Sequence, residues 1–335
     1  MASSVRIAID SMGGDFGLRT TLPAALQTLA LYPQLELVLV GDEARIRESL
    51  AGRDHDRLSI KHSSQVLTMG DKPSAILRQK ADCSMRVAID LLAAHTVDAV
   101  VSAGNTGALM TAGCFVLNTL PGIERPAICK AMPVKEGCGY VLDLGANVDS
   151  SASQLHRFAL MATARCRVVH QVERPRVALL NIGAEAIKGN EQVKLAAELI
   201  GNDKSLNYIG FIEANALFEG GFDVLVCDGF VGNVALKACE GTAKHIAALI
   251  KAELNRNWRS KLRAMFAQPL LKGVFKQLDP NQYNGASFLG LKGVVVKGHG
   301  NSSVESFACA IEQALFEVER NMLAAIEQQL SLSLS

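Results

Sequence analysis

Short apolar runs alternate with amphipathic segments along most of this 335-residue chain. Each run ends in residues that favour turns, and a helical periodicity resumes soon afterwards. This alternation predicts repeated strand–helix units and therefore a largely parallel sheet. The predicted strands are Val5–Ile9, Leu35–Val40, Ser59–His62, Asp98–Val101, Tyr140–Leu144, Val177–Asn181, Val224–Cys227 and Gly293–Val296.

Apolar residues spaced by three and four positions predict the helices between these strands. In the final helix this spacing continues to the end, which indicates one long core helix without a visible functional role. The predicted helices are Thr20–Ala30, Glu43–Leu50, Ala75–His95 and Val304–Leu330, with another opening near Val234.

Six of the predicted strands end in loops rich in glycine, asparagine, serine, aspartate, lysine or histidine. In open α/β sheets, ligands bind outside the carboxyl ends of the strands, so we expect these loops to converge on one site. The candidate phosphate-binding and substrate-binding residues in them are Gly104, Asn105, Thr106, Asp228, Gly232, His299 and Ser302.

The stretch from residue 224 to 241 has the strongest pattern of this kind, since an apolar run meets Asp228-Gly229 and a helical pattern follows. A helix N-terminus offers unpaired backbone N–H groups and the positive end of the helix dipole, which suits an anion. Asn233 would lie at its mouth, with an amide that both donates and accepts hydrogen bonds. A capped loop without any ligand gives the same pattern.

The other polar residues of these loops each have two interpretations. Lys188 could neutralise a phosphate or a developing oxyanion, or be an ordinary surface lysine. His299 could act as a base or phosphate donor, or be satisfied by backbone groups. Ser302 could contact substrate or cap the last helix. Asp228 and Asp10 could orient Lys188 or shape their own turns.

Several familiar site types are missing from the sequence. It contains no G-x-x-x-x-G-K-[ST] phosphate loop and no G-x-S-x-G nucleophile turn. Gly298-His299-Gly300 is not followed about 20 positions later by an acidic residue at a strand end, so a nicotinamide cofactor lacks support. The histidines and cysteines lack the spacing of metal ligands. We therefore expect neither a cofactor nor a metal.

Composition narrows the class of protein. Hydrophobic residues make up 49% and charged residues 20% of the chain, which is typical of a globular protein. The net charge of +1 gives no bias toward nucleic acid. Eight scattered cysteines suit a reducing compartment, and no window reaches the roughly 18 apolar residues of a membrane span. We expect a soluble, cytoplasmic protein.

Eight short stretches spread over the chain match one known family in collinear order. They are AIDSMGGDFG (8–17), SAGNTGALM (102–110), GIERPA (122–127), VLDLGANVD (141–149), NIGAEAIKGN (181–190), YIGFIEAN (208–215), DGFVGNVALK (228–237) and DPNQYNGASFLGLKGVVVKGHG (279–300). On these stretches the chain closely resembles the bacterial phosphate acyltransferase (PlsX) family, and the resemblance covers nearly the whole sequence.

The resemblance implies a single domain over residues 1–335, a three-layer α/β/α sandwich similar to the isocitrate and isopropylmalate dehydrogenases, and a homodimer. It implies transfer of a long-chain acyl group from acyl-acyl carrier protein to inorganic phosphate, which gives acyl phosphate for phosphatidic acid and phospholipid synthesis. It also implies that Lys188 and Asn233 are catalytic. Phosphate is already nucleophilic, so this reaction needs positioning and oxyanion stabilisation more than a strong base.

Residues 244–278 depart from the strand–helix alternation. The part from Lys244 to Lys276 carries eight lysines and arginines against Glu253, a net charge of +7. Pro269 interrupts its apolar pattern, so we predict a basic amphipathic helical hairpin that projects from the domain. Its candidate contacts with a membrane or an acidic carrier protein are Trp258, Leu270, Leu271 and Phe275.

A dimer partner packed on the same apolar residues is the alternative for this hairpin. With membrane contact, the protein would associate peripherally with the inner face of the cell membrane. There the membrane acyl-phosphate glycerol-3-phosphate acyltransferase is a further expected partner.

Three other function classes explain parts of the sequence. A hydride-transferring dehydrogenase on a related fold would need a nucleotide fingerprint and acidic metal ligands, and neither is visible. A phosphate acetyltransferase that uses coenzyme A would share the chemistry without these motifs. A lipid-binding scaffold would explain only the hairpin, and Lys188 and Asn233 would then be replaceable.

Overall fold

The computed structural model describes residues 4–53, 55–135, 137–256 and 285–333. Its strands are β1 (Val5–Asp10), β2 (Leu35–Gly41), β3 (Leu58–His62), β4 (Ala99–Ser102), β5 (Ala127–Val134), β6 (Gly137–Leu142), β7 (Arg176–Asn181), β8 (Asn207–Glu213), β9 (Val224–Val226), β10 (Ala286–Leu289) and β11 (Val294–Lys297). Within the described residues they form one eleven-stranded sheet in the order β3-β2-β1-β4-β11-β10-β5-β6-β9-β7-β8.

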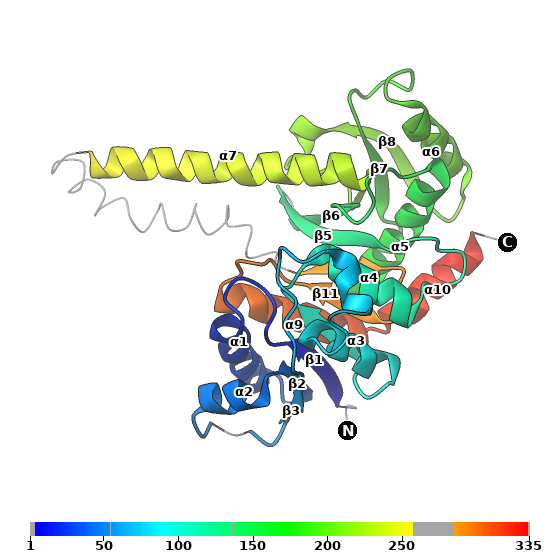
Figure 1. The fold of residues 1–335 in the computed structure, drawn as a ribbon. Helices are drawn as coiled ribbons and strands as arrows, with labels where there is room; N and C mark the ends of the chain where they lie inside the picture. The colour runs from blue at the N-terminus through cyan, green and yellow to red at the C-terminus, as the bar shows by residue number, and fades with distance from the viewer. Residues whose placement is uncertain (1–3, 54, 136, 257–284, 334–335) are drawn as a thin grey trace.

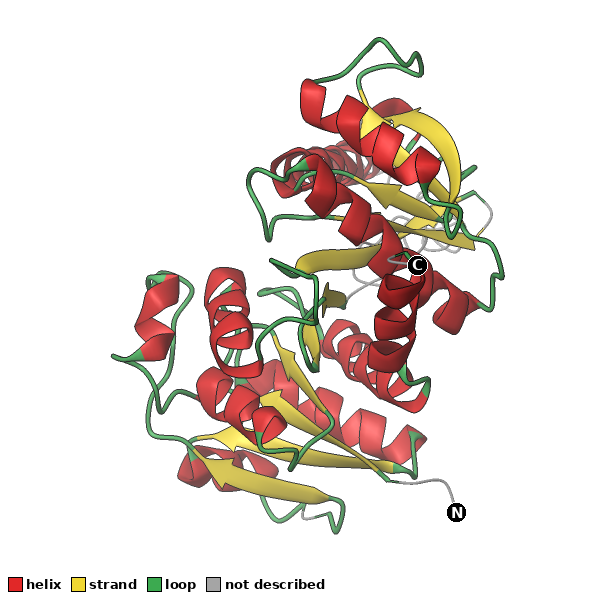
Figure 2. Cartoon of the chain, turned by 90° about the vertical axis from the view of Figure 1, so that its right-hand side faces the viewer, coloured by secondary structure: helices red, strands yellow, loops and turns green. Residues whose placement is uncertain are grey.

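Helices cover both faces of this sheet (Figures 1 and 2). The helices are α1 (Leu18–Leu31), α2 (Glu43–Leu50), α3 (Ser84–Ala93), α4 (Thr106–Ala112), α5 (Ala152–His170), α6 (Glu191–Asn202), α7 (Gly229–Asn255), α9 (Val304–Glu319) and α10 (Met322–Leu332), with short turns η1 (Pro73–Leu77), η2 (Gly113–Leu117) and η3 (Ala214–Ala216). Buried side chains of α3 and α4 and partly buried side chains of α7 pack on one face, and buried side chains of the other helices pack on the opposite face. The predicted α/β/α sandwich is confirmed.

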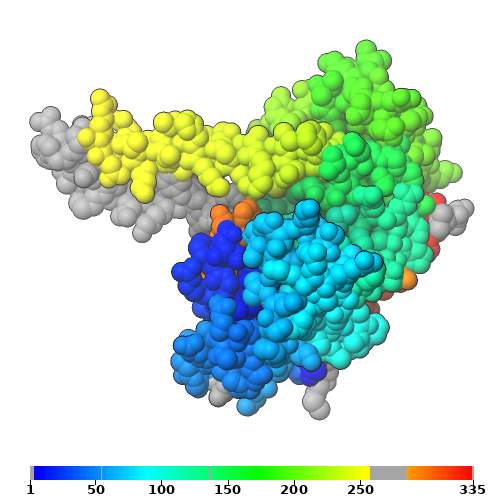
Figure 3. All heavy atoms as spheres, in the orientation of Figure 1, coloured from blue at the N-terminus to red at the C-terminus, as the bar shows by residue number. Residues whose placement is uncertain are grey.

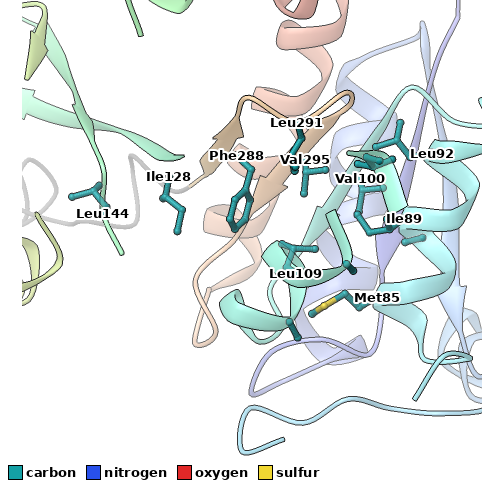
Figure 4. Close-up of a cluster of buried hydrophobic side chains, with 14 of the residues drawn as sticks. Met85, Ile89, Leu92, Val100, Leu109, Ile128, Leu144, Phe288, Leu291 and Val295 are labelled. Carbon is teal, nitrogen blue, oxygen red and sulfur yellow. The ribbon is translucent and has the colours of Figure 1, made fainter. Parts of the chain in front are cut away.

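Because both faces are covered, the central strands are apolar at nearly every position. In β1, Ala8 faces the α3–α4–α7 layer, whereas Ile7 and Ile9 face the opposite layer. The cluster on the α3–α4–α7 face runs continuously beneath both halves of the molecule, and Figure 4 shows Leu109 and Phe288 in it. The two halves therefore share one core across the centre of the sheet.

The strands of the two halves point in opposite directions. β1, β2, β3, β4 and β11 are mutually parallel, β10 and β5 form antiparallel pairs in the centre, and β6 is antiparallel to β5. β9, β7 and β8 then follow the direction of β6. The sheet is largely parallel, as predicted. The two halves therefore approach their carboxyl ends from opposite directions, and the expected convergence of the loops on one site stays a prediction.

Two predicted helices are interrupted. The predicted helix Ala75–His95 consists of η1 and α3, because the segment between them pairs with residues 64–65. In that segment the Asp82 carboxylate accepts hydrogen bonds from the Ser64 N–H and hydroxyl. The last predicted helix breaks between α9 and α10 at Asn321, which has a φ of +56°. Asparagine tolerates this left-handed conformation better than most residues.

The second half of α7 projects away from the sheet (Figures 1 and 3). This half includes residues 244–255 of the predicted hairpin, which are helical. Trp258, Leu270, Leu271 and Phe275 lie outside the described residues, so the rest of the hairpin stays a prediction. No helix among the described residues is long and apolar enough to cross a membrane.

Candidate functional site

The N-terminus of α7 packs closely on the loop after β6. Asp228 caps the helix, since its carboxylate accepts a hydrogen bond from the Val231 N–H at 2.9 Å. A Cβ added at Gly229 would lie 2.2 Å from the Asn147 carbonyl oxygen, and one at Gly232 would lie 1.9 Å from the Asp143 carbonyl oxygen. A side chain at either position would clash with this loop, so the close packing requires glycine at both. A contact between Gly232 and substrate stays a prediction.

The loop itself is organised by the buried carboxylate of Asp143. This carboxylate accepts hydrogen bonds from the N–H groups of Ile128 (3.0 Å), Ala146 (3.1 Å) and Asn147 (2.7 Å), and from the Asn147 side chain (2.9 Å). Burial raises the pKa of Asp143, and these hydrogen bonds oppose the rise. Four bonds to one side chain hold the surface on which α7 begins.

Asn233 lies in the first turns of α7 and is exposed to solvent. It neighbours Gly145, because a Cβ added at Gly145 would lie 3.4 Å from the Asn233 Cγ atom. Gly145 has a φ of +116°, a conformation that favours glycine. The Asn233 amide therefore stands beside a fixed loop and faces water, where a substrate can reach it.

Lys188 lies in the loop after β7, the strand that pairs with β9. The Asn181 side chain closes this loop by donating hydrogen bonds to the carbonyl oxygens of Gly183 (3.1 Å) and Lys188 (3.2 Å). The Lys188 ammonium is 2.8 Å from Glu185, and its side chain is 46% exposed. The hydrogen bond that Lys188 donates to the Glu185 carboxylate, and the negative charge of that group, raise the pKa of Lys188, which is therefore a cation at neutral pH.

These contacts decide between the two roles left open for the aspartates. Asp228 caps α7, and Asp10 accepts hydrogen bonds from the hydroxyls of Ser84 and Ser102, both at 2.6 Å. Asp228 thus caps its own helix and Asp10 ties the end of β1 to α3 and β4, whereas Glu185 pairs with Lys188.

The candidate residues after β4 also shape their own loop. The Asn105 side chain accepts a hydrogen bond from the Ala108 N–H at 3.0 Å and donates to the Met69 and Asp71 carbonyl oxygens at 3.0 and 3.3 Å. The Gly104 N–H donates to the Ser102 hydroxyl at 3.0 Å. Thr106 is the partly exposed first residue of α4.

The loop after β11 contains His299 and Ser302. The Ser302 hydroxyl donates to the His299 carbonyl oxygen at 2.6 Å, while Ser303 caps α9. Burial lowers the pKa of His299, as does the charge of Lys237 on α7, whereas Glu240 on α7 raises it. His299 is therefore within electrostatic reach of α7.

The predicted site residues thus form two groups. Lys188, Asn233, Asp228 and Gly232 lie where β7 and β9 end, and the others lie where β4 and β11 end. No hydrogen bond or ion pair between described residues joins Lys188 or Asn233 to the second group. The link is α7, since Asn233 and Lys237 are four positions apart and share a helix face.

Sequence reasoning missed two buried lysines near the second group, Lys130 on β5 and Lys297 at the end of β11. The Lys297 ammonium donates hydrogen bonds to the Ala103 carbonyl oxygen at 3.2 Å and to the Gly298 carbonyl oxygen. Burial lowers its pKa to about 8. The sequence K-G-H-G after an apolar run could have identified Lys297 as a candidate, because a lysine at the end of a buried strand is unusual.

A cavity of about 430 Å³ lies where the N-termini of α5, α6 and α7 meet. Its lining includes Val148, Ser150, Asn190, Asp228 and Phe230. Across the described ranges, no cluster of three or more histidine, cysteine or acidic side chains could hold a metal ion.

Comparison with known proteins identifies the family. The model of a family described as "Fatty acid synthesis protein" matches residues 5–325. A phosphate acyltransferase from Alcanivorax borkumensis is 50% identical over 329 residues, which are 97% of each chain. A phosphate acyltransferase from Methylococcus capsulatus is 53% identical over 317 residues, or 94% of this chain and 93% of its own.

A solved structure has a similar fold. A phosphotransacetylase from Streptococcus pyogenes has a TM-score of 0.61 and 16% sequence identity, and the match covers 96% of this chain and 94% of that one. At this identity the likeness concerns the fold alone. From the near-full-length matches in sequence, the chain belongs to the phosphate acyltransferase family and is an acyltransferase of lipid biosynthesis.

Proposed function

We propose that this enzyme transfers a long-chain fatty acyl group from acyl-acyl carrier protein to inorganic phosphate, which gives acyl phosphate for phosphatidic acid and phospholipid synthesis. The observation that carries the proposal is the arrangement at the start of α7. A capped helix N-terminus presents Asn233 beside Gly145, and the neighbouring strand β7 leads into the loop of Lys188. No redox or metal chemistry is needed for this transfer.

In the proposed reaction, a phosphate oxygen attacks the thioester carbonyl carbon and forms a C–O bond. The tetrahedral oxyanion then collapses, the C–S bond breaks, and the carrier thiolate leaves and takes up a proton. Asn233 donates its amide N–H to the oxyanion. Since Glu185 raises the pKa of Lys188, Lys188 acts as a cation that stabilises negative charge and not as a base.

Exposed apolar side chains on the same loops support an acyl substrate. Ile182 and Ile187 lie beside Lys188, Val148 lies in the loop after β6, and Phe230 lies in the first turn of α7. All four are exposed, Ile187 to 83%. Val148 and Phe230 also line the cavity of about 430 Å³, and exposed apolar side chains beside a cavity suit a fatty acyl chain.

The remaining substrate contacts in the proposal are Gly104, Asn105, Thr106, His299 and Ser302. Because the charges of Lys237 and Glu240 on α7 act on His299, we assign these residues to the part of the substrates that extends along α7 from Asn233.

The proposed enzyme is a homodimer. It associates peripherally with the inner face of the cell membrane through the predicted hairpin of residues 244–278. Support comes from α7, whose projecting half carries the exposed apolar residues Ile246 and Leu249. Flotation with anionic liposomes tests the membrane contact. Leu270→Glu with Phe275→Glu is expected to abolish flotation, and unchanged binding would reject the role.

The decisive experiment measures acyl phosphate formed from palmitoyl-acyl carrier protein and inorganic phosphate, with palmitoyl-coenzyme A as the alternative donor. We expect turnover that depends on both the carrier substrate and phosphate. Activity with palmitoyl-coenzyme A but not with the carrier substrate would mean that the acyl donor is a coenzyme A ester. No acyl phosphate from either donor would refute the proposal.

A further inference from the structure

One row of paired strand positions crosses the centre of the sheet and carries charged side chains. Lys130 on β5 pairs with Ala286 on β10, and Ala286 pairs with Lys297 on β11. Lys297 pairs with Ser102 on β4, and Ser102 pairs with Asp10 on β1. Directly paired positions place their side chains on the same face of a sheet. All five side chains therefore point to one side.

That side is the one covered by α7. Ile128 and Val295 lie two positions from Lys130 and Lys297 along their strands, and both belong to the cluster on the α3–α4–α7 face. Strands lie about 4.8 Å apart, so the backbones of the two lysines are about 10 Å apart. Only the methyl group of Ala286 stands between them in the row, and their long side chains can reach a common ligand.

Most charges in this region already have partners. The Asp10 carboxylate accepts from two serine hydroxyls, and the Lys297 ammonium donates to two carbonyl oxygens. On α7, the Lys237 ammonium is 2.8 Å from the Glu240 carboxylate. These contacts leave Lys130 as the exception in the row.

Lys130 is only 9% exposed. It makes no side-chain hydrogen bond and no ion pair with any residue in the described part of the chain. Glu240 attracts its charge, but Lys237 pairs with Glu240 and repels Lys130. A buried ammonium without a counter-ion is unfavourable, so the arrangement favours an anion from outside the chain.

We propose that Lys130, together with Lys297 and Lys237, binds a phosphate group of a substrate. This inference rests on the proposed function, in which two phosphate groups reach the enzyme: free inorganic phosphate and the phosphodiester of the carrier's prosthetic arm. Lys237 lies four residues after Asn233, about 6 Å along α7. The site therefore adjoins the group that stabilises the oxyanion.

The test compares Lys130→Met with Lys130→Arg and with Lys135→Met. Lys135 lies just beyond the end of β5, is 68% exposed in its side chain and pairs with Glu219, so it is a control for loss of a lysine nearby. Initial rates are measured while phosphate and palmitoyl-acyl carrier protein are varied separately. Lys130→Met is expected to raise one KM at least ten-fold, Lys130→Arg to retain most of the affinity, and Lys135→Met to leave both KM values unchanged.

The two arms identify the source of the phosphate group. A higher KM for inorganic phosphate assigns the site to the free substrate, and a higher KM for the carrier substrate assigns it to the prosthetic arm. If both KM values of Lys130→Met stay within two-fold of the wild type, the proposal is wrong.

Stability and binding measurements separate this role from a structural one. Without phosphate, Lys130→Met is expected to unfold at the same temperature as the wild type or higher, because a buried charge is removed. A lower unfolding temperature with both KM values unchanged would mean that Lys130 serves the fold instead. Calorimetric titration with inorganic phosphate and with phosphopantetheine remains informative even if the wild type makes no acyl phosphate. Lys130→Met is then expected to lose binding of one of them, and undiminished binding of both would overturn the inference.

Discussion

The buried ion pair between Arg165 on α5 and Glu317 on α9 is expected to be a main determinant of stability. Two guanidinium nitrogens of Arg165 donate to one Glu317 carboxylate oxygen, at 2.9 and 3.2 Å, and both side chains are 3% exposed. Ser287 on β10 and Gln313 also donate to that oxygen. The guanidinium carbon lies 4.1 Å from the ring centroid of Tyr140 on β6.

Glu317→Gln removes the negative charge and leaves the guanidinium buried without a counter-ion. Loss of one partner of a buried pair costs about 3 to 5 kcal/mol of unfolding free energy. Unfolding 335 residues at about 2.1 cal/mol/K per residue corresponds to an entropy of about 0.7 kcal/mol/K. We therefore expect the unfolding temperature to fall by about 4 to 7 °C.

Thermal unfolding followed by circular dichroism measures this change. Glu327→Gln is the matched control, since Glu327 on α10 is exposed, and we expect its unfolding temperature to equal that of the wild type. The double variant Arg165→Met with Glu317→Leu removes both charges and is expected to recover much of the loss. A Glu317→Gln variant that unfolds within 1 °C of the wild type would show that the pair contributes little.

Three further predictions concern the candidate site. Asn233→Ala is expected to lower kcat roughly 10²- to 10³-fold without loss of stability, because it removes one oxyanion donor from an exposed position; a kcat within a few-fold of the wild type would exclude this role. Gly232→Ala is expected to destabilise the protein by about 1 to 3 kcal/mol in chemical unfolding, because the new methyl group would meet the Asp143 carbonyl oxygen. Gly241→Ala, in the same helix with nothing near its Cβ position, is the control and is expected to stabilise by about 1 kcal/mol; equal effects would contradict the packing. Burial lowers the pKa of Lys297 from 10.5 to about 8, so between these values this side chain binds more protons in the unfolded chain, and its own contribution to stability grows as pH rises through that window. Lys297→Met is expected to lack this gain, and parallel stability curves for the two proteins would rule the effect out.

Many strands on either side of the central β10 and β5 could be predicted from the sequence, because they are buried on both faces. The predicted strands near β1, β2, β4, β7, β9 and β11 agree with the structure to within one residue at each end. The strands that were not predicted lack an unbroken apolar run. β5 contains Lys130 and Pro133, and β8 is only partly buried and includes Gly210. In these strands tertiary packing overrides local pattern.

The polar residues of the loops were only partly predictable. The local sequence marks Lys188, Asn233 and His299 as candidate site residues, because each lies in a segment rich in glycine or asparagine. Lys130 has no such marker, since it lies between Cys129 and Ala131 in an ordinary strand. Its significance depends on the register that pairs it with Ala286, and register between distant strands is not written in the local sequence.

Strand direction explains why the candidate residues do not meet through loops alone. The antiparallel pairs of β10 and β5 reverse the second half of the sheet, so the loops of Lys188 and His299 leave the sheet in opposite directions. A single site then needs an element that connects the two sets of loops. In the proposed site this element is α7, which begins on the Asp143 loop and carries Lys237 and Glu240, whose charges act on His299 and Lys130. The glycines at 229 and 232 let α7 start close enough to the sheet for this connection, so their role in the site is to position the helix that connects its two parts.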